Sequence, residues 1–219
     1  MNTLPPPIVA AGQEIETASF EYIDAHAGSR QGYAEAEWPL VRRLIHTSGD
    51  FEFNGLTRFH PEALMAGREA LMQGAPLVVD VSMIRAGLTR RRLEPLGIEV
   101  HQFNADPEVI RGAVAEKTTR TVQAMRLAWR RGLLQGGVVA IGNAPTALLE
   151  LIRLVREEGV LPALVIGMPV GFISAAESKD LLMTLDRPPW ISICGTKGGS
   201  TLVVAALHAL MDLALEGKG

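Results

Sequence analysis

Apolar positions along the chain fall into short runs that alternate with segments of helical periodicity. The apolar runs are rich in β-branched residues and lie at Leu77–Val81, Ile98–His101, Val138–Ile141, Leu164–Ile166 and Trp190–Ile193. Helical patterns follow at 106–133, 144–157, 174–184 and 199–215. This alternation predicts a parallel sheet with helices on both faces, because strands that are apolar throughout are buried on both sides.

Two further helical patterns lie within residues 11–47, and the glycines of Gly28–Gly32 separate them. With right-handed crossovers, the whole pattern predicts an α/β protein: a three-layer α/β/α sandwich, flavodoxin-like, with about five mainly parallel strands and extra N-terminal helices. Three consecutive prolines, Pro5 to Pro7, exclude a helix at the start. We therefore expect a flexible arm over residues 1–10 and a single domain over residues 11–219.

The composition narrows the class of protein. With 21 basic and 24 acidic residues, the net charge of -3 gives no strong attraction to nucleic acid or to a membrane surface. No run of about 18 uncharged apolar residues predicts a membrane span, and the start MNTLPPPIVAAGQEIE is unlike a signal peptide. Cys194 is the single cysteine, so an intrachain disulfide is impossible. Together these features favour a cytoplasmic protein.

The segments that follow the predicted strands carry the candidate chemistry, because sheets of this type bind ligands at the carboxyl ends of their strands. They read DVSMIRAGLTRRR, FNADPE, GNAPTA, GMPVGFISAAES and CGTKGGST. Glycines let the backbone approach a ligand, and helix N-termini offer N–H groups to anions. GNAPTA, with Asn143, is either a simple helix cap or a binding site for a carboxylate or phosphate.

Basic residues gather near the same edge: Arg85, Arg90, Arg91, Arg92, Lys117 and Arg120. Each alone fits a solvated charge, but the group suits a polyanion, since arginine binds carboxylates through two parallel hydrogen bonds. Lys197 lies beside two glycines, but its segment is not a Walker A motif. The chain has no cysteine pair, HExxH, GxGxxG or GxSxG motif, so we predict no metal site and no dinucleotide site.

His46 lies in LIHTSGDFEF, at the end of an amphipathic helical pattern. Histidine can donate or accept a proton near neutral pH, which suits acid catalysis. From position alone, a helix-end histidine bonded to the backbone explains the residue at least as well. Asp50 and Glu52 follow closely, and they either orient His46 or cap the next element.

Taken together, these segments resemble the precorrin-8X methylmutase family of cobalamin biosynthesis, which includes the cobalt-precorrin-8 methylmutases. The matching segments span residues 15–212 and read IHTSGDFEF, DVSMIRAGLTRRRL, EKTTRTVQA, GNAPTALLEL, PALVIGMPVGFISAAESK and GTKGGSTLVVAALHAL. The resemblance implies a cofactor-free isomerase that moves a methyl group from C-11 to C-12 of a corrin precursor. The product is hydrogenobyrinate or, with cobalt, cobyrinate. The acidic pair in TSGDFEF favours the cobalt branch.

The resemblance also implies roles for individual residues. It makes His46 the acid catalyst, and it matches a family serine, threonine and arginine to Ser19, Thr89 and Arg120. We expect substrate contacts from Ser19, Thr89, Arg90, Arg120, Asn143, Met168, Gly171 and Lys197. We expect apolar walls for the flat, carboxylate-bearing ring from Met83, Ile84, Val170, Phe172 and Ile173. The family further implies a homodimer, and product passage to the next pathway enzyme is a possible extension.

Two other functions remain open. A non-catalytic corrinoid carrier would use the same binding cleft without converting its ligand. A nucleotide-dependent enzyme would share the flavodoxin-like fold, although the chain lacks a phosphate-loop signature.

Overall fold

The computed structural model describes residues 8–30 and 32–217. The helices are α1 (Ile8–His26), α2 (Trp38–Ser48), α3 (Phe53–Leu56), α4 (Ala63–Met72), α5 (Ser82–Gly87), α6 (Arg90–Leu96), α7 (Pro107–Ala115), α8 (Arg120–Arg130), α9 (Pro145–Glu158), α10 (Ala175–Met183) and α11 (Ser200–Glu216). The strands are β1 (Thr57–Phe59), β2 (Leu77–Val79), β3 (Val100–His101), β4 (Val138–Ile141), β5 (Leu164–Gly167) and β6 (Trp190–Ile193). Residues 1–7 of the predicted arm lie outside the described residues, and α1 begins within the range 1–10 expected for that arm.

The strands form one six-stranded sheet in the order β1-β6-β5-β4-β2-β3. The five predicted strands are all present and pair in parallel, in a flavodoxin-like order. The predicted α/β sandwich is therefore confirmed. The sixth strand, β1, was missed: it has three residues, too few for a readable period, and it pairs antiparallel with β6 at the sheet edge.

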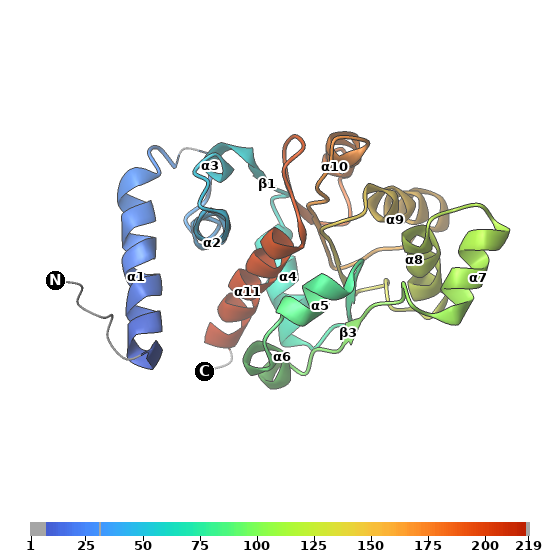
Figure 1. The fold of residues 1–219 in the computed structure, drawn as a ribbon, viewed down its shortest axis with the longest axis horizontal. Helices are drawn as coiled ribbons and strands as arrows, with labels where there is room; N and C mark the ends of the chain where they lie inside the picture. Colours follow the sequence, from blue (N-terminus) through green and yellow to red (C-terminus); the bar gives the residue numbers. More distant parts are fainter. Residues whose placement is uncertain (1–7, 31, 218–219) are drawn as a thin grey trace.

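Helices cover both faces of the sheet, as Figure 1 shows. On one face lie α4, α5, α6 and α11, with α2 packed outside α11 and α1 packed outside α2. On the other face lie α8, α9 and α10, with α7 against α8. Successive strand residues point to opposite faces, so Val138 joins one apolar core and Val139 joins the other. Because both sides of these strands are buried, their successive residues are mostly apolar, which gives the apolar runs in the sequence.

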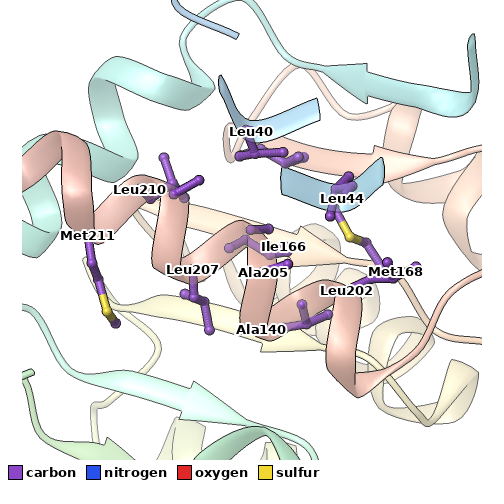
Figure 2. Packing of buried hydrophobic residues seen from close by; sticks show 14 of the residues in the cluster. Leu40, Leu44, Ala140, Ile166, Met168, Leu202, Ala205, Leu207, Leu210 and Met211 are labelled. Carbon is purple, nitrogen blue, oxygen red and sulfur yellow. The ribbon is translucent and has the colours of Figure 1, made fainter. Parts of the chain in front are cut away.

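The position of α2 follows from its packing on α11. Leu40 and Leu44 are fully buried and point toward α11 and the sheet, as Figure 2 shows. Burying each such side chain contributes roughly 1.5–3 kcal/mol. Arg43 bonds Asp212 near the end of α11, whereas Thr47 lines a cavity with Ser200 at its start. The helices therefore run antiparallel, and the last turn of α2 reaches the carboxyl edge of the sheet.

Several helices differ from the sequence-based expectation. The pattern over 106–133 is two helices, α7 and α8, because Lys117 adopts a left-handed conformation (φ 54°) and Thr119 caps α8 by accepting from the Val122 N–H. The short helices α3, α5 and α6 and the helix α4 were not predicted. Within the described part of the chain, no helix combines the length and apolar character that crossing a membrane requires.

Candidate active site

His46 reaches the protein surface because of how α2 ends. The helix buries Leu44 and Ile45 and turns His46 toward the opposite, exposed side. Gly49 ends the helix in a left-handed conformation (φ 67°), and its N–H donates to the Ile45 carbonyl at 2.8 Å. The imidazole meets the Phe20 ring of α1 edge-on, with centroids 5.2 Å apart. The end of α2 thus places an accessible histidine at the carboxyl edge of the sheet.

A cavity of about 520 Å³ lies between α1 and α2 and includes His46 in its wall. Its lining comprises Ile15, Ala18, Ser19, Tyr22, Ile23, Ile45, His46, Gly49 and Phe51. The Ser19 hydroxyl donates to the Ile15 carbonyl at 2.7 Å, and its oxygen can still accept a hydrogen bond. Among the described residues, Ser19 is the only other predicted site residue in this wall. The result is a largely apolar cavity whose wall also carries the polar side chains of Ser19, Tyr22 and His46.

The loop that leads into α9, read in GNAPTA as a cap or an anion site, binds a carboxylate of the protein itself. The Asp80 carboxylate, which is 0% exposed, accepts from the backbone N–H groups of Gly142, Asn143 and Ala144 at 3.1, 2.9 and 2.8 Å. Burial raises the pKa of the Asp80 carboxyl, while these N–H groups act in the opposite direction. The protein's own carboxylate therefore binds the backbone N–H groups just before α9, and the Asn143 side chain stays exposed beside it.

Other predicted residues share the carboxyl edge of the sheet. The hydroxyls of Thr119 and Thr121, on either side of Arg120, bond the Thr146 hydroxyl in the first turn of α9 at 3.1 and 3.0 Å. This places the exposed Arg120 next to the end of β4. Gly171 follows β5 with φ 154°, a region that favours glycine, and its N–H donates to the Thr196 carbonyl.

Two predicted contacts are corrected by burial. Met168 is 0% exposed and lies in the core below Leu44, as Figure 2 shows. Its backbone N–H donates to Ile141 and its carbonyl accepts from Gly199, so it supports the strand-end loops from within. Ile84 is also 0% exposed and cannot form a wall for a ligand. The other predicted wall residues, Met83, Val170, Phe172 and Ile173, are exposed.

Thr89 and Arg90 lie away from the His46 cavity, at the start of α6. Both are exposed, and the Thr89 hydroxyl accepts from Arg92 at 3.4 Å. Arg92 binds both carboxylate oxygens of Asp212, at 2.7 and 3.0 Å, and Arg43 binds the same carboxylate. The charge of Arg92 is therefore engaged within the protein, whereas Arg90 belongs to the accessible basic surface.

Lys197 and the acidic residues after His46 bind one another. The Lys197 ammonium contacts the Asp50 carboxylate and lies 2.6 Å from the Glu52 carboxylate. The ammonium lowers the pKa of the Asp50 carboxyl, and the two carboxylates raise the pKa of Lys197. The expectation that Asp50 and Glu52 orient His46 directly is therefore replaced by an ion-pair cluster centred on Lys197.

Sequence reasoning missed two polar residues, one at the end of a strand and one inside α11. Asp80 was readable only as the residue directly after a buried strand. His208 of α11 lines a second cavity, of about 290 Å³, with residues of α2 and α5. Burial and the nearby Arg92 and Arg43 lower the pKa of His208 to about 4. Its Nε2 atom is buried without a partner among the described residues, and nothing in the local sequence signalled this environment.

Candidate metal ligands do not cluster in the described ranges: no group of three or more His, Cys, Asp or Glu side chains there is placed to hold an ion.

Comparison with known proteins identifies the family. The family model for precorrin-8X methylmutase matches residues 14–213. The cobalt-precorrin-8 methylmutase of Priestia megaterium is 45% identical over 96% of this chain and 92% of its own, and that of Leptospira interrogans is 44% identical over 94% and 96%. A solved structure, described as the precorrin-8x methyl mutase from Thermus thermophilus, superimposes with a TM-score of 0.87 at 50% identity, over 94% of this chain and 98% of that one. The chain therefore belongs to the precorrin-8X methylmutase family of isomerases, as its motifs indicated.

Proposed function

We propose that this protein moves a methyl group from C-11 to C-12 of precorrin-8 or cobalt-precorrin-8, with His46 as the general acid. Family membership supports the reaction class. The observation that carries the role of His46 is its place in the wall of a largely apolar cavity of about 520 Å³, which Ser19 of α1 also lines. A flat macrocycle needs such an apolar surface for its face and a proton donor at its edge.

In the proposed reaction, the bond from the methyl group to C-11 breaks and a bond to C-12 forms. His46 donates a proton to the ring as the electron pairs rearrange, and a proton lost elsewhere on the ring keeps substrate and product isomeric. General acid catalysis contributes typically ~10²–10⁴ in rate. The remaining acceleration comes from holding the ring in its reactive conformation.

The accessible polar groups are proposed to bind the carboxylates around the ring. Arg120, Asn143 and Gly171 lie at the carboxyl edge of the sheet, Ser19 lies in the His46 cavity, and Thr89 and Arg90 lie on the flanking α6. Exposed guanidinium groups suit carboxylates through paired hydrogen bonds. Met168 is left out of this set because its side chain is fully buried.

We also propose that the protein acts as a cytoplasmic homodimer and can pass its product to the next pathway enzyme. The loop after β5 supports a second copy, since Phe172 is 92% exposed and Ile173 is 83% exposed. Apolar side chains of this size usually contact a partner when they cluster on a surface. Sedimentation of the wild type and of Phe172→Glu tests the dimer: a wild-type monomer contradicts it.

The test of the function is incubation with metal-free and with cobalt-containing precorrin-8, followed by absorption spectroscopy. The wild type should convert at least one of them, which also identifies the branch. His46→Ala should bind the coloured ligand but lose about 10²–10⁴ in turnover. His60→Ala is the matched control, because His60 lies outside the cavity and bonds the Asp186 carbonyl. Full activity in His46→Ala refutes the role of His46, and binding without conversion by the wild type indicates a carrier.

A further inference from the structure

The turn that follows α2 forms part of the His46 cavity. Gly49 and Phe51 both line that cavity, three and five positions after the histidine. The Gly49 N–H closes the last helical turn on Ile45, and the Ser48 hydroxyl bonds the Leu44 carbonyl at 2.8 Å. The path of this turn therefore sets both the cavity wall and the end of the helix that carries His46.

One cation contacts this turn from another loop. The Lys197 ammonium binds the carboxylates of Asp50 and Glu52 and lies 5.7 Å from the centre of the Phe53 ring. The two carboxylates flank Phe51 in the chain, so both ends of that residue are tied to the same group. The contact is long-range, because Lys197 and Asp50 are 147 residues apart in the sequence.

The backbone of Lys197 is itself fixed. Its carbonyl accepts a hydrogen bond from the ammonium of Lys179, a residue of α10 that is 0% exposed. A Cβ at the neighbouring Gly198 would lie 2.4 Å from the Met168 carbonyl oxygen, so the two strand-end loops are in close contact. The side chain of Lys197 thus extends from a rigid loop to the turn beside His46.

We propose that Lys197 is a positioning residue for the reaction at His46: its ion pairs with Asp50 and Glu52 hold the Gly49–Phe51 wall and the last turn of α2 in place. This inference rests on the proposed function of His46. It replaces the sequence-based expectation that Lys197 binds a substrate carboxylate.

The charge of the cluster argues against a substrate contact. One ammonium and two carboxylates leave one net negative charge around Lys197. A polycarboxylate ligand is repelled by such a cluster, and it must compete with two carboxylates that are already within hydrogen-bonding distance. A role that keeps the cluster intact is consistent with this charge.

Kinetics of Lys197→Met separate the two roles. A positioning role lowers kcat by roughly 10- to 100-fold, because a displacement of about 1 Å has effects of that size. It changes KM by less than about threefold, since ground-state binding is retained. Lys197→Arg, which keeps the charge, should recover most of the lost kcat. Arg130→Met is the matched control: Arg130 is a half-exposed cation paired with Glu108, on the helix pair α7–α8.

The carboxylate partners give a second kinetic test. Asp50→Asn/Glu52→Gln should lower kcat as Lys197→Met does, and combining all three changes should add no further loss. If Lys197 binds substrate instead, Lys197→Met raises KM, and neutralising the two carboxylates lowers it. A raised KM with unchanged kcat in Lys197→Met overturns the proposal.

Amide hydrogen exchange tests the coupling without any substrate. Residues 45–53 should exchange faster in Lys197→Met than in the wild type, with no change in Arg130→Met. Unchanged exchange overturns the positioning role even if the enzyme is active. Conversely, failure of the wild type to convert either form of precorrin-8 refutes the proposed function, while the exchange result still reports on the link between Lys197 and the His46 turn.

Discussion

Replacing Asp80 with alanine should be one of the most destabilising single changes near the strand ends. The carboxylate is fully buried and accepts from three backbone N–H groups. Two of these belong to buried residues, Gly142 and Ala144. Each buried donor left without a partner costs about 1–3 kcal/mol. The free energy of unfolding should therefore fall by about 2–6 kcal/mol, which is a large share of the stability of a typical domain.

Urea unfolding of purified variants measures this difference, with Asp106→Ala as the matched control. Asp106 likewise accepts from a backbone N–H, that of Glu108 at 2.9 Å, where it caps α7, but it is partly exposed. Loss of such a cap costs about 1 kcal/mol. If Asp80→Ala loses no more stability than Asp106→Ala, the buried hydrogen bonds of Asp80 contribute less to the free energy of unfolding than proposed.

The freed N–H groups offer a second measurement. With Asp80 removed, the backbone N–H groups of residues 142–144, just before α9, can bind an external anion, as clusters of backbone N–H groups commonly do. Sulfate should therefore raise the melting temperature of Asp80→Ala more than that of the wild type. An equal effect of sulfate on both proteins contradicts the view that Asp80 fills an anion site.

Two further predictions concern α11 and the loop before it. Folding lowers the pKa of His208 from 6.5 to about 4, so the folded state binds this proton less readily than the unfolded state. The stability that depends on neutral His208 is therefore present above pH 6.5. It is lost as the pH falls toward 4. Urea unfolding from pH 7 to 4 should show this loss of stability in the wild type and a smaller loss in His208→Gln. Equal losses in the two proteins refute the role of His208. Gly198→Ala should cost about 1–3 kcal/mol by forcing a Cβ against the Met168 carbonyl. Gly55→Ala, where no atom lies within 4 Å, should be near neutral, and equal stabilities of the two variants contradict the packing argument.

Local patterns in the sequence determined much of the fold. The five apolar runs became the five parallel strands, and Val138–Ile141 and Trp190–Ile193 match without any shift at their ends. Burial on both faces makes each strand continuously apolar, which a single sequence displays. The antiparallel β1 was not predictable, because a three-residue edge strand owes its existence to the open edge of β6 rather than to its own pattern.

For the candidate site, too, some features followed from the sequence and others only from the fold. The sequence by itself determined a histidine at the end of an amphipathic helix and a set of loops at the carboxyl ends of the strands. Only the tertiary structure decided which partners the charged side chains near those loops bind. It paired Asp80 with N–H groups 62 to 64 residues away, and Lys197 with Asp50 and Glu52 across 147 and 145 residues. Helical and strand periods arise from neighbouring residues, whereas the partner of a charged group is set by the packing of elements that are distant in the chain.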